Sequence, residues 1–275
     1  MNNRERLKQN NSKLKILSSE SKKLPNAINT TDADATSKDI VEGKTAYVND
    51  EKITGTLIVN NLQFGDYSGS RINSALLSID KLNTSGISDM SQMFEYCTNL
   101  TYIPTFDTSD ATNMNYMFDG CKNLASIPQL DTSNVTSMLC MFQYCYNLTT
   151  IPQLDTSNVT DMRYMFYNCK YLTAIPQLDT SNVTSMLCMF CDCYRLIDLP
   201  LLNTSSVADM NSMFSNCNDL SDESLNNILT MCTNATSYTS TKTLKEIGLS
   251  EKRATTCMTL SNYQAFLDAG WTTGY

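Results

Sequence analysis

The sequence predicts an α/β solenoid in which six coils, each with one helix and one short strand, stack along a single axis. The first observation is a 24-residue unit that recurs six times over residues 82–225 without insertion or deletion. A fixed period of this length is typical of a solenoid, where each unit buries its apolar face only against its neighbours. The second observation is the apolar spacing inside the unit, and the third is a proline near the end of five of the six units.

The first half of each unit carries the apolar residues. The third unit reads LDTSNVTSMLCMFQYCYNLTTIPQ from Leu130, which is unit position 1, and apolar residues fall at unit positions 6, 9, 12, 13 and 16. Spacings of 3, 3, 1 and 3 predict one buried stripe of an α-helix. The preceding Asp-Thr-Ser-Asn segment supplies side-chain oxygens that would cap the first free amides of that helix.

The second half of the unit predicts a short strand. In the third unit Leu148, Ile151 and Pro152 follow the helical stripe in an L-x-x-I-P pattern. Because proline cannot donate to a strand ladder, any strand is very short and ends by the isoleucine. Each coil is therefore predicted to contain one helix, one brief strand and one polar turn, which is the plan of a leucine-rich-repeat-like solenoid.

Flanking segments of different character adjoin the repeats. TSKDIVEG predicts a short helix over 36–43, and TAYVNDEKITGT predicts a hairpin that turns at 49–50. After the repeats, a helix is expected from Ser221 or Asp222, and a last helix is expected between a Ser261 cap and a closing Gly270, with Trp271 as a lid. The expected organisation is a basic arm at 1–31 with a thin heptad pattern that would suit a weak coiled coil, a small helix-plus-hairpin (α+β) attachment module at 32–60, a linker and solenoid N-cap at 61–81, the repeats at 82–225 and a helical C-terminal cap at 226–275.

Charge and hydropathy exclude several partners. The chain has a net charge of −8, although its first 24 residues hold seven basic side chains against two acidic ones. An acidic body argues against nucleic acid as the ligand of the repeats. No apolar run approaches the roughly 18 residues of a membrane span, so membrane insertion is not expected. The charged start MNNRERLKQNNSKLK lacks the apolar segment of a signal peptide, so none is expected.

Cysteine is used as a core residue. Six of the 11 cysteines occupy unit position 16, as small buried apolar side chains do. Stacked helical units would stand about 8–10 Å apart, beyond the Cα separation of a disulfide, about 4.4–6.8 Å. We therefore expect free thiols in a reducing cytoplasm. The six are Cys97, Cys121, Cys145, Cys169, Cys193 and Cys217.

Catalysis and metal binding are poorly supported. The chain has no histidine and no glycine-rich phosphate loop, so no catalytic residue and no cofactor are predicted. Aspartate recurs at unit position 2 (Asp107, Asp131, Asp155 and Asp179). A calcium ladder is one interpretation, but the Ser and Thr neighbours favour turn and capping roles. The cluster at 188, 191 and 193 lacks the second ligand pair of a zinc site, so no metal is expected.

Tyrosine is the residue type that suggests binding. Exposed tyrosine gives rigid amphipathic contact area at a small entropic cost. The alternative is that these side chains fill gaps along the flanks of the coils and bind nothing. The candidate binding residues are Tyr96, Tyr116, Tyr144, Tyr146, Tyr164, Tyr167, Tyr171 and Tyr194.

Two stretches resemble known families. The repeat motif LDTSNVTxMxxMFxxCxxLTxIPQ over 82–225 resembles the BspA-like leucine-rich repeats of bacterial surface proteins. This resemblance implies adhesion to proteins or host surfaces through the repeats. DADATSKDIVEGKTAYVNDEKITGTL, at 32–57, is similar to a module in tail and other structural proteins of phages that infect Gram-positive bacteria. Asp50 stands where that module commonly has glycine. TTCMTLSNYQAFLDAGW is similar to the ends of phage-encoded repeat proteins.

Together these resemblances imply a non-enzymatic virion protein, associated with the tail or baseplate and made in the bacterial cytoplasm. Its amino-terminal region would contact other virion structural proteins, and its repeats would contact a host surface protein or glycan. A homo-oligomer, including a trimer, remains open. The alternatives are a bacterial cell-surface adhesin of the BspA type and a head or tail decoration protein without a ligand.

Overall fold

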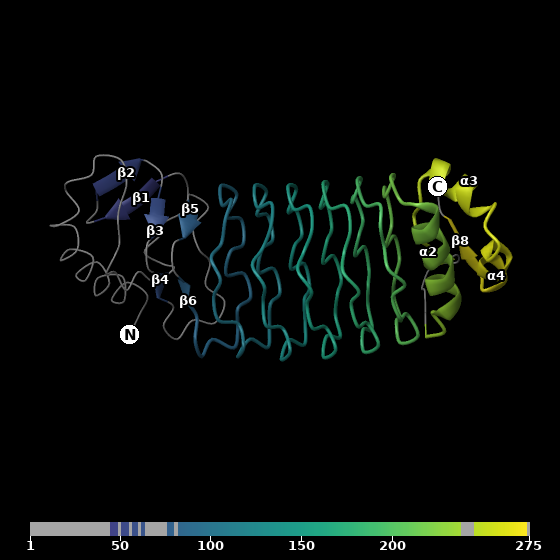
Figure 1. Cartoon of the computed structure of the whole chain (residues 1–275), viewed down its shortest axis with the longest axis horizontal. Coiled ribbons are helices and arrows are strands. Elements are labelled where there is room, and N and C mark those ends of the chain that lie inside the picture. Colours follow the sequence, from purple (N-terminus) through teal and green to yellow (C-terminus); the bar gives the residue numbers. More distant parts are fainter. Residues whose placement is uncertain are drawn as a thin grey trace.

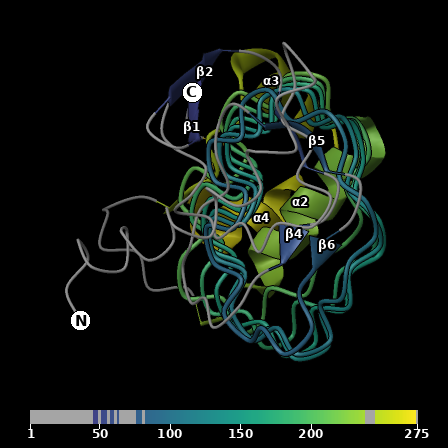
Figure 2. The ribbon, with the colours of Figure 1, turned by 90° about the vertical axis from the view of Figure 1, so that its left-hand side faces the viewer.

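The repeats form a stack of similar coils. The computed structural model describes residues 45–48, 51–54, 57–59, 62–63, 76–79, 82–237 and 245–273. The coils run side by side along one axis, with a group of helices at the carboxyl-terminal end (Figure 1). Viewed along that axis, the coils follow nearly the same outline (Figure 2). The predicted solenoid is therefore present.

A stack of phenylalanine rings gives the spacing of the coils. The ring at unit position 13 of each coil lies 5.3–5.8 Å from the ring of the next coil, and neighbouring rings are within 9° of parallel. This spacing is close to the separation of strands in a sheet, about 4.7–4.9 Å. The six rings are Phe94, Phe118, Phe142, Phe166, Phe190 and Phe214.

The predicted apolar stripe is the core. Unit positions 6, 9, 12, 13 and 16 are buried in all six coils. In the third coil all five side chains have no exposed area: Val135, Met138, Met141, Phe142 and Cys145. Along the axis of the solenoid, each buried methionine, phenylalanine or cysteine of the stripe therefore packs against the same residue type in the neighbouring coil.

The predicted helix is wrong, because the stripe is built from consecutive turns. The amide of Met141 donates to the carbonyl of Met138 at 3.2 Å, and the amide of Cys145 donates to that of Phe142 at 3.1 Å. The third residue of each turn has positive φ, 55° at Cys140 and 56° at Tyr144. An i to i+3 bond with positive φ at the third residue is the pattern of a type II turn. Unit positions 11 and 15 have positive φ in all six coils.

The alternate amides of this segment donate to the next coil. Those of Cys140, Phe142 and Tyr144 donate to carbonyls of the fourth coil at 2.8–3.0 Å. An α-helix would satisfy these amides within its own segment. Moreover, packed helices stand about 8–10 Å apart, so helices cannot stack at the 5.5 Å separation of the Phe118 and Phe142 rings.

The predicted strand is reduced to single contacts. On the L-x-x-I side, the described repeats contain one isolated bridge, between Ala174 and Asp198. Single hydrogen bonds continue it, such as the amide of Thr173 to the carbonyl of Thr149 at 3.1 Å. A second series of isolated bridges joins unit position 8 of all six coils, as between Ser137 and Asp161.

Paired strands precede the repeats. β1 (Thr45–Val48) and β2 (Glu51–Thr54) form the predicted antiparallel hairpin, with Val48 opposite Glu51. β3 (Leu57–Val59) pairs in parallel with β5 (Leu76–Ile79), and β4 (Leu62–Gln63) pairs in parallel with β6 (Leu82–Asn83). The expected helix at 36–43 and the arm at 1–31 lie outside the described residues.

The stack therefore begins before residue 82. Parallel pairing of β3 with β5 and of β4 with β6 adds a partial coil ahead of the first complete unit. The sequence contains a signal for this start. The L-x-x-I-x-x-L spacing of the repeats also occurs one period before the first unit's own, at Leu76, Ile79 and Leu82. Of the segment at 61–81, which the sequence predicts to be a linker and solenoid N-cap, the described strands β4 and β5 belong to this partial coil.

A helical cap closes the other end. α2 (Asp222–Asn234) begins at the predicted place, with Ser221 as its N-cap, and buries Leu225, Ile228, Leu229 and Cys232 as expected. α3 (Glu251–Cys257) and α4 (Tyr263–Asp268) follow. β7 (Lys245–Glu246) and β8 (Trp271–Thr272) pair in parallel.

The ends of the cap differ in one detail from the expectation. The N-cap of α4 is Asn262 and not Ser261, because Ser261 lies in the turn that precedes it. Gly270 closes the helix as predicted, with φ +83° and its amide bonded to the carbonyl of Leu267. Trp271 is buried, at 1 % exposure, as expected for a lid.

The repeat thiols are free, but the reason given by the sequence is wrong. The coils are close enough for a disulfide by the Cα criterion, since neighbouring phenylalanine rings lie 5.3–5.8 Å apart. Five of the six thiols, all except that of Cys97, instead donate to the phenylalanine carbonyl of the preceding coil, as Cys145 does to Phe118 at 3.1 Å. All 11 cysteines are free in the structure. Unit position 16 therefore selects a small apolar side chain that also donates a hydrogen bond.

Candidate functional site

The recurring aspartates form turns. The carboxylate of Asp131 accepts bonds from the amide and the hydroxyl of Ser133, at 3.1 and 2.7 Å. The buried hydroxyl of Thr132 donates to the carbonyl of Asp155 in the next coil at 2.8 Å. The turn role predicted for unit position 2 is confirmed, although the turn caps no helix.

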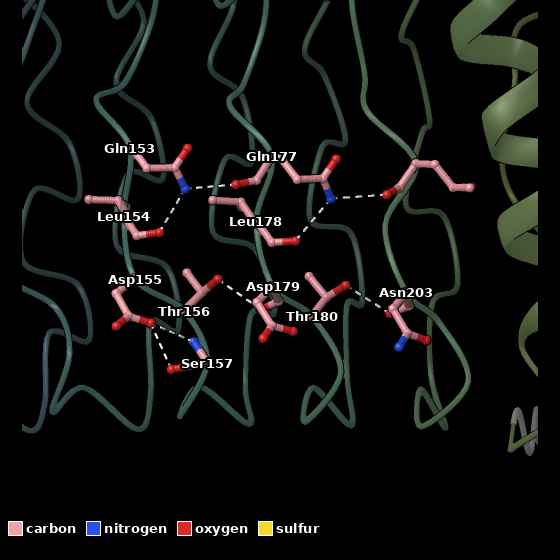
Figure 3. A pocket seen from close by; sticks show the side chains of 11 residues that line it. Gln153, Leu154, Asp155, Thr156, Ser157, Gln177, Leu178, Asp179, Thr180 and Asn203 are labelled. Atoms are coloured by element: carbon pink, nitrogen blue, oxygen red, sulfur yellow. Dashed lines mark hydrogen bonds between the residues drawn. The ribbon is translucent and has the colours of Figure 1, made fainter.

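A shallow hollow of about 590 Å³ lies on this side, over the third to sixth coils (Figure 3). Figure 3 shows that its polar groups bond along the stack: the side-chain amide of Gln153 donates to the backbone carbonyl of Gln177 at 2.7 Å, and the hydroxyl of Thr156 donates to the backbone carbonyl of Asp179 at 2.8 Å. Bonds from Ser157 lower the pKa of Asp155. The hollow is therefore a surface of internal ladders, in which most donors already have partners.

Four candidate tyrosines come together on another side of the coils. Tyr144 meets Tyr167 edge-on, with ring centroids 5.3 Å apart, and also meets Tyr146 at 6.2 Å. Tyr164 meets Tyr167 at 5.9 Å. Edge-to-face pairs at these distances are favourable arrangements of aromatic rings. The amide of Tyr171 donates to the carbonyl of Tyr146, which places this fifth tyrosine beside the group. We call these five residues the tyrosine face.

The other three candidates lie beyond the tyrosine face. Tyr96, in the first coil, lies over Gly120, where a Cβ would be 2.4 Å from its ring. Tyr116 hydrogen-bonds to Cys140. The hydroxyl of Tyr194 donates to the carboxylate of Asp192 at 3.2 Å. The structure thus gathers five of the eight predicted residues and leaves three with other neighbours.

Several of these tyrosines hold an unfavourable backbone conformation. Tyr96, Tyr116, Tyr144 and Tyr164 have φ of 56–58°. The left-handed region costs a residue with a Cβ roughly 1–2 kcal/mol. Gly120 occupies the same unit position as Tyr144, so the stack accepts glycine there. Because unit positions 11 and 15 have positive φ in every coil, this conformation belongs to the turns and does not single out the tyrosines.

The phenols of Tyr164 and Tyr167 stay neutral near pH 7. Burial raises the pKa of Tyr164, and burial together with the neighbouring Tyr144 raises the pKa of Tyr167 to about 12. Neutral phenols both donate and accept hydrogen bonds. The exposed edge of the face includes Tyr171, at 54 % exposure. This surface therefore offers aromatic area and hydroxyl groups in one place.

Sequence reasoning missed the basic residues of this surface. Residues 82–237 contain only four, and three of them occupy unit positions 17 and 18, namely Lys122, Lys170 and Arg195. The ammonium groups of Lys122 and Lys170 lie over the ring of Tyr146, 5.5 and 4.4 Å from its centroid. Their concentration at two unit positions was a signal available in the sequence.

The cysteine cluster separates in the fold. Cys188 and Cys191 are half-buried and hydrogen-bond to each other, whereas the thiol of Cys193 points into the core and donates to the carbonyl of Phe166 at 3.0 Å. In the part of the chain that the structure describes, no three acidic or cysteine side chains gather as a metal site would require. Among the same residues no helix is long and apolar enough to cross a membrane.

A known family has the pattern of this repeat region. The family described as Mycoplasma protein of unknown function, DUF285, matches residues 67–151 and 146–246. The chain belongs to this family. The match begins within the segment that the paired strands add to the stack, and it does not reach 32–57.

Other comparisons add little. No curated protein matches the chain. Among solved structures, the chain is similar to a leucine-rich repeat protein of T. pallidum, with 18% identity and a TM-score of 0.46, over 63% of this chain and 77% of that one.

Proposed function

We propose that this protein is a non-enzymatic recognition protein whose coils present the tyrosine face to a partner on a cell surface. The observation that carries the proposal is the gathering of five tyrosines from the third and fourth coils. Interface residues that dominate binding energy are enriched in tyrosine. The surface-adhesion role implied by the BspA-like resemblance supports the same proposal.

The setting proposed for this recognition is a phage particle, with the amino-terminal region attached to other virion proteins. The similarity of 32–57 to a phage structural module supports it, and the β1–β2 hairpin lies inside that segment. A bacterial cell-surface adhesin is the second candidate, and the BspA-like motif of the repeats supports it. Immunogold electron microscopy with an antibody to the chain separates them: label on particles supports the first, label on the cell envelope supports the second, and label on neither rejects both.

Recognition is tested by replacing tyrosines in the full chain. Tyr144, Tyr164 and Tyr167 replaced together by alanine should keep the fold, because none of them belongs to the buried stripe. Binding of the purified protein to host cells should fall at least tenfold, since truncating a dominant interface residue costs about 2 kcal/mol or more. Tyr102→Ala, outside the candidate set and 60 % exposed, is the matched control. If the triple variant binds cells as the parent does, the face is not the binding surface and a decoration role without a ligand gains support.

A further inference from the structure

We infer that Lys122, Tyr146 and Lys170 form a binding site for the carboxylate groups of an acidic glycan. This inference rests on the proposed function and names the class of its ligand. The three residues share unit position 17 of the second, third and fourth coils, so the stack places them in one row along its axis. The sequence separates them by 24 residues each, and only the fold makes them neighbours.

The row holds two positive charges at fixed places. The ammonium group of Lys122 lies 5.5 Å from the centroid of the Tyr146 ring, and that of Lys170 lies 4.4 Å from it. Ammonium groups within about 6 Å of a ring centroid are attracted by the electrons of its face. Tyr146 thus draws a lysine from each neighbouring coil towards itself. Two flexible side chains are thereby ordered before any ligand arrives, which reduces the entropy lost on binding.

Neither charge is neutralised inside the described part of the chain. Arg163 pairs with Asp161 at 2.6 Å, and Arg195 approaches Asp219 at 3.5 Å. Lys122 and Lys170 form no ion pair with any described residue. Residues 82–237 carry 15 acidic side chains against four basic ones, so two unpaired lysines on one row are a local exception. An anionic group from outside the protein is the counter-charge that this arrangement lacks.

The surroundings favour a sugar chain over an acidic peptide. Beside the row lies Tyr144, whose ring and hydroxyl group suit the mixed apolar and polar faces of a sugar. The ammonium groups of the two lysines lie 5.5 and 4.4 Å from the same ring centroid, so two carboxylates that bind them lie beside an aromatic ring.

Two immobilised acidic glycans, hyaluronan and polygalacturonate, test the site with the full chain. The same polymers with their carboxylates reduced to alcohols are the matched neutral ligands, and poly-glutamate represents an acidic protein. The variant Lys122→Gln/Lys170→Gln removes the row. The variant Lys252→Gln/Arg253→Gln removes two positive charges elsewhere, since both residues lie on α3 in the carboxyl-terminal cap. Urea denaturation verifies that both variants are folded.

The parent should bind at least one acidic glycan, bind its reduced form much more weakly, and lose affinity as salt is added. The Lys122→Gln/Lys170→Gln variant should lose affinity about tenfold, as expected for two exposed ion pairs, and the control variant should lose little. Failure to bind either acidic glycan, equal binding of the reduced forms, an unchanged affinity of the lysine variant, or tighter binding to poly-glutamate would each overturn the inference.

The two proposals fail in different ways. If the triple tyrosine variant loses binding to host cells while the lysine variant keeps it, the recognition surface stands and the acidic-glycan site is rejected. If neither variant changes binding to cells and the parent binds no glycan, both proposals are rejected together.

Discussion

Asn168 provides a test of whether the buried half of each coil is a turn or a helix. It occupies unit position 15, with φ of +60°. Replacement by glycine and by alanine removes the same amide group, so the difference between the two variants isolates the backbone. In a helix, alanine would be the more stable residue by about 0.8–1.0 kcal/mol. In a turn with positive φ, the order should reverse.

The expected size follows from two opposing terms. The left-handed conformation destabilises alanine relative to glycine by about 1–2 kcal/mol. The greater freedom of glycine in the unfolded chain offsets about 0.4–1 kcal/mol of this. We therefore expect the Asn168→Gly variant to be the more stable by about 0.5–1 kcal/mol, which differs from the helical expectation by about 1.3–2 kcal/mol.

Urea denaturation followed by far-ultraviolet circular dichroism measures the difference, provided that the slopes of the two transitions agree. Asn147, at unit position 18, is the control because its φ is not positive. There the alanine variant should be the more stable by about 0.4–1 kcal/mol. An Asn168→Ala variant more stable than Asn168→Gly by the helical amount would refute the turn geometry and restore the helix.

Three further predictions concern packing, thiols and acid. Gly120→Ala should destabilise the protein by about 1–3 kcal/mol, because at φ +72° its Cβ would lie 2.4 Å from the Tyr96 ring. In urea denaturation, adding Tyr96→Ala to this variant should restore part of the lost stability. If the effects of the two substitutions simply add, the contact is contradicted. Thiol titration of native protein should show at most two fast groups, Cys188 and Cys191, and the rest only in denaturant, since the other nine are buried; a third fast thiol would contradict that burial. Hydrogen bonds from Ser157 hold the pKa of Asp155 below its ordinary value of 3.8. Their contribution to the stability of the fold is therefore present above pH 3.8 and is lost as the pH falls through the lower pKa of the folded protein. Asp155→Asn should therefore lose less stability than the parent on acidification from about pH 5 to about pH 3, and an equal loss would count against the bonds.

The tyrosine face shows how much of a surface site a sequence can reveal. Tyr144, Tyr146 and Tyr167 were predicted as binding residues from their excess and from their places off the apolar stripe. Their mutual contacts could not be predicted, because ring orientation depends on the coils to either side. Lys122 and Lys170 were missed for the same reason. Each is an isolated basic residue along the chain and becomes a neighbour of Tyr146 only when three coils stack.

The sequence by itself determined the period, the buried side chains and the carboxyl-terminal cap. Met138, Phe142 and Cys145 had to be buried because they recur at fixed positions of every unit, and burial is read from the apolar pattern without knowing the path of the chain. α2 (Asp222–Asn234) was predictable because its cap and its apolar face lie within one segment.

Only the tertiary structure decided the conformation of the coils. The same spacing of apolar residues suits one face of a helix and a row of turns, since both bury unit positions 9, 12, 13 and 16. The choice depends on where the amides find their acceptors. The amide of Phe142 donates to the carbonyl of Met165, 23 residues further along the chain. That acceptor exists only once the next coil is in place, at a separation too small for a helix.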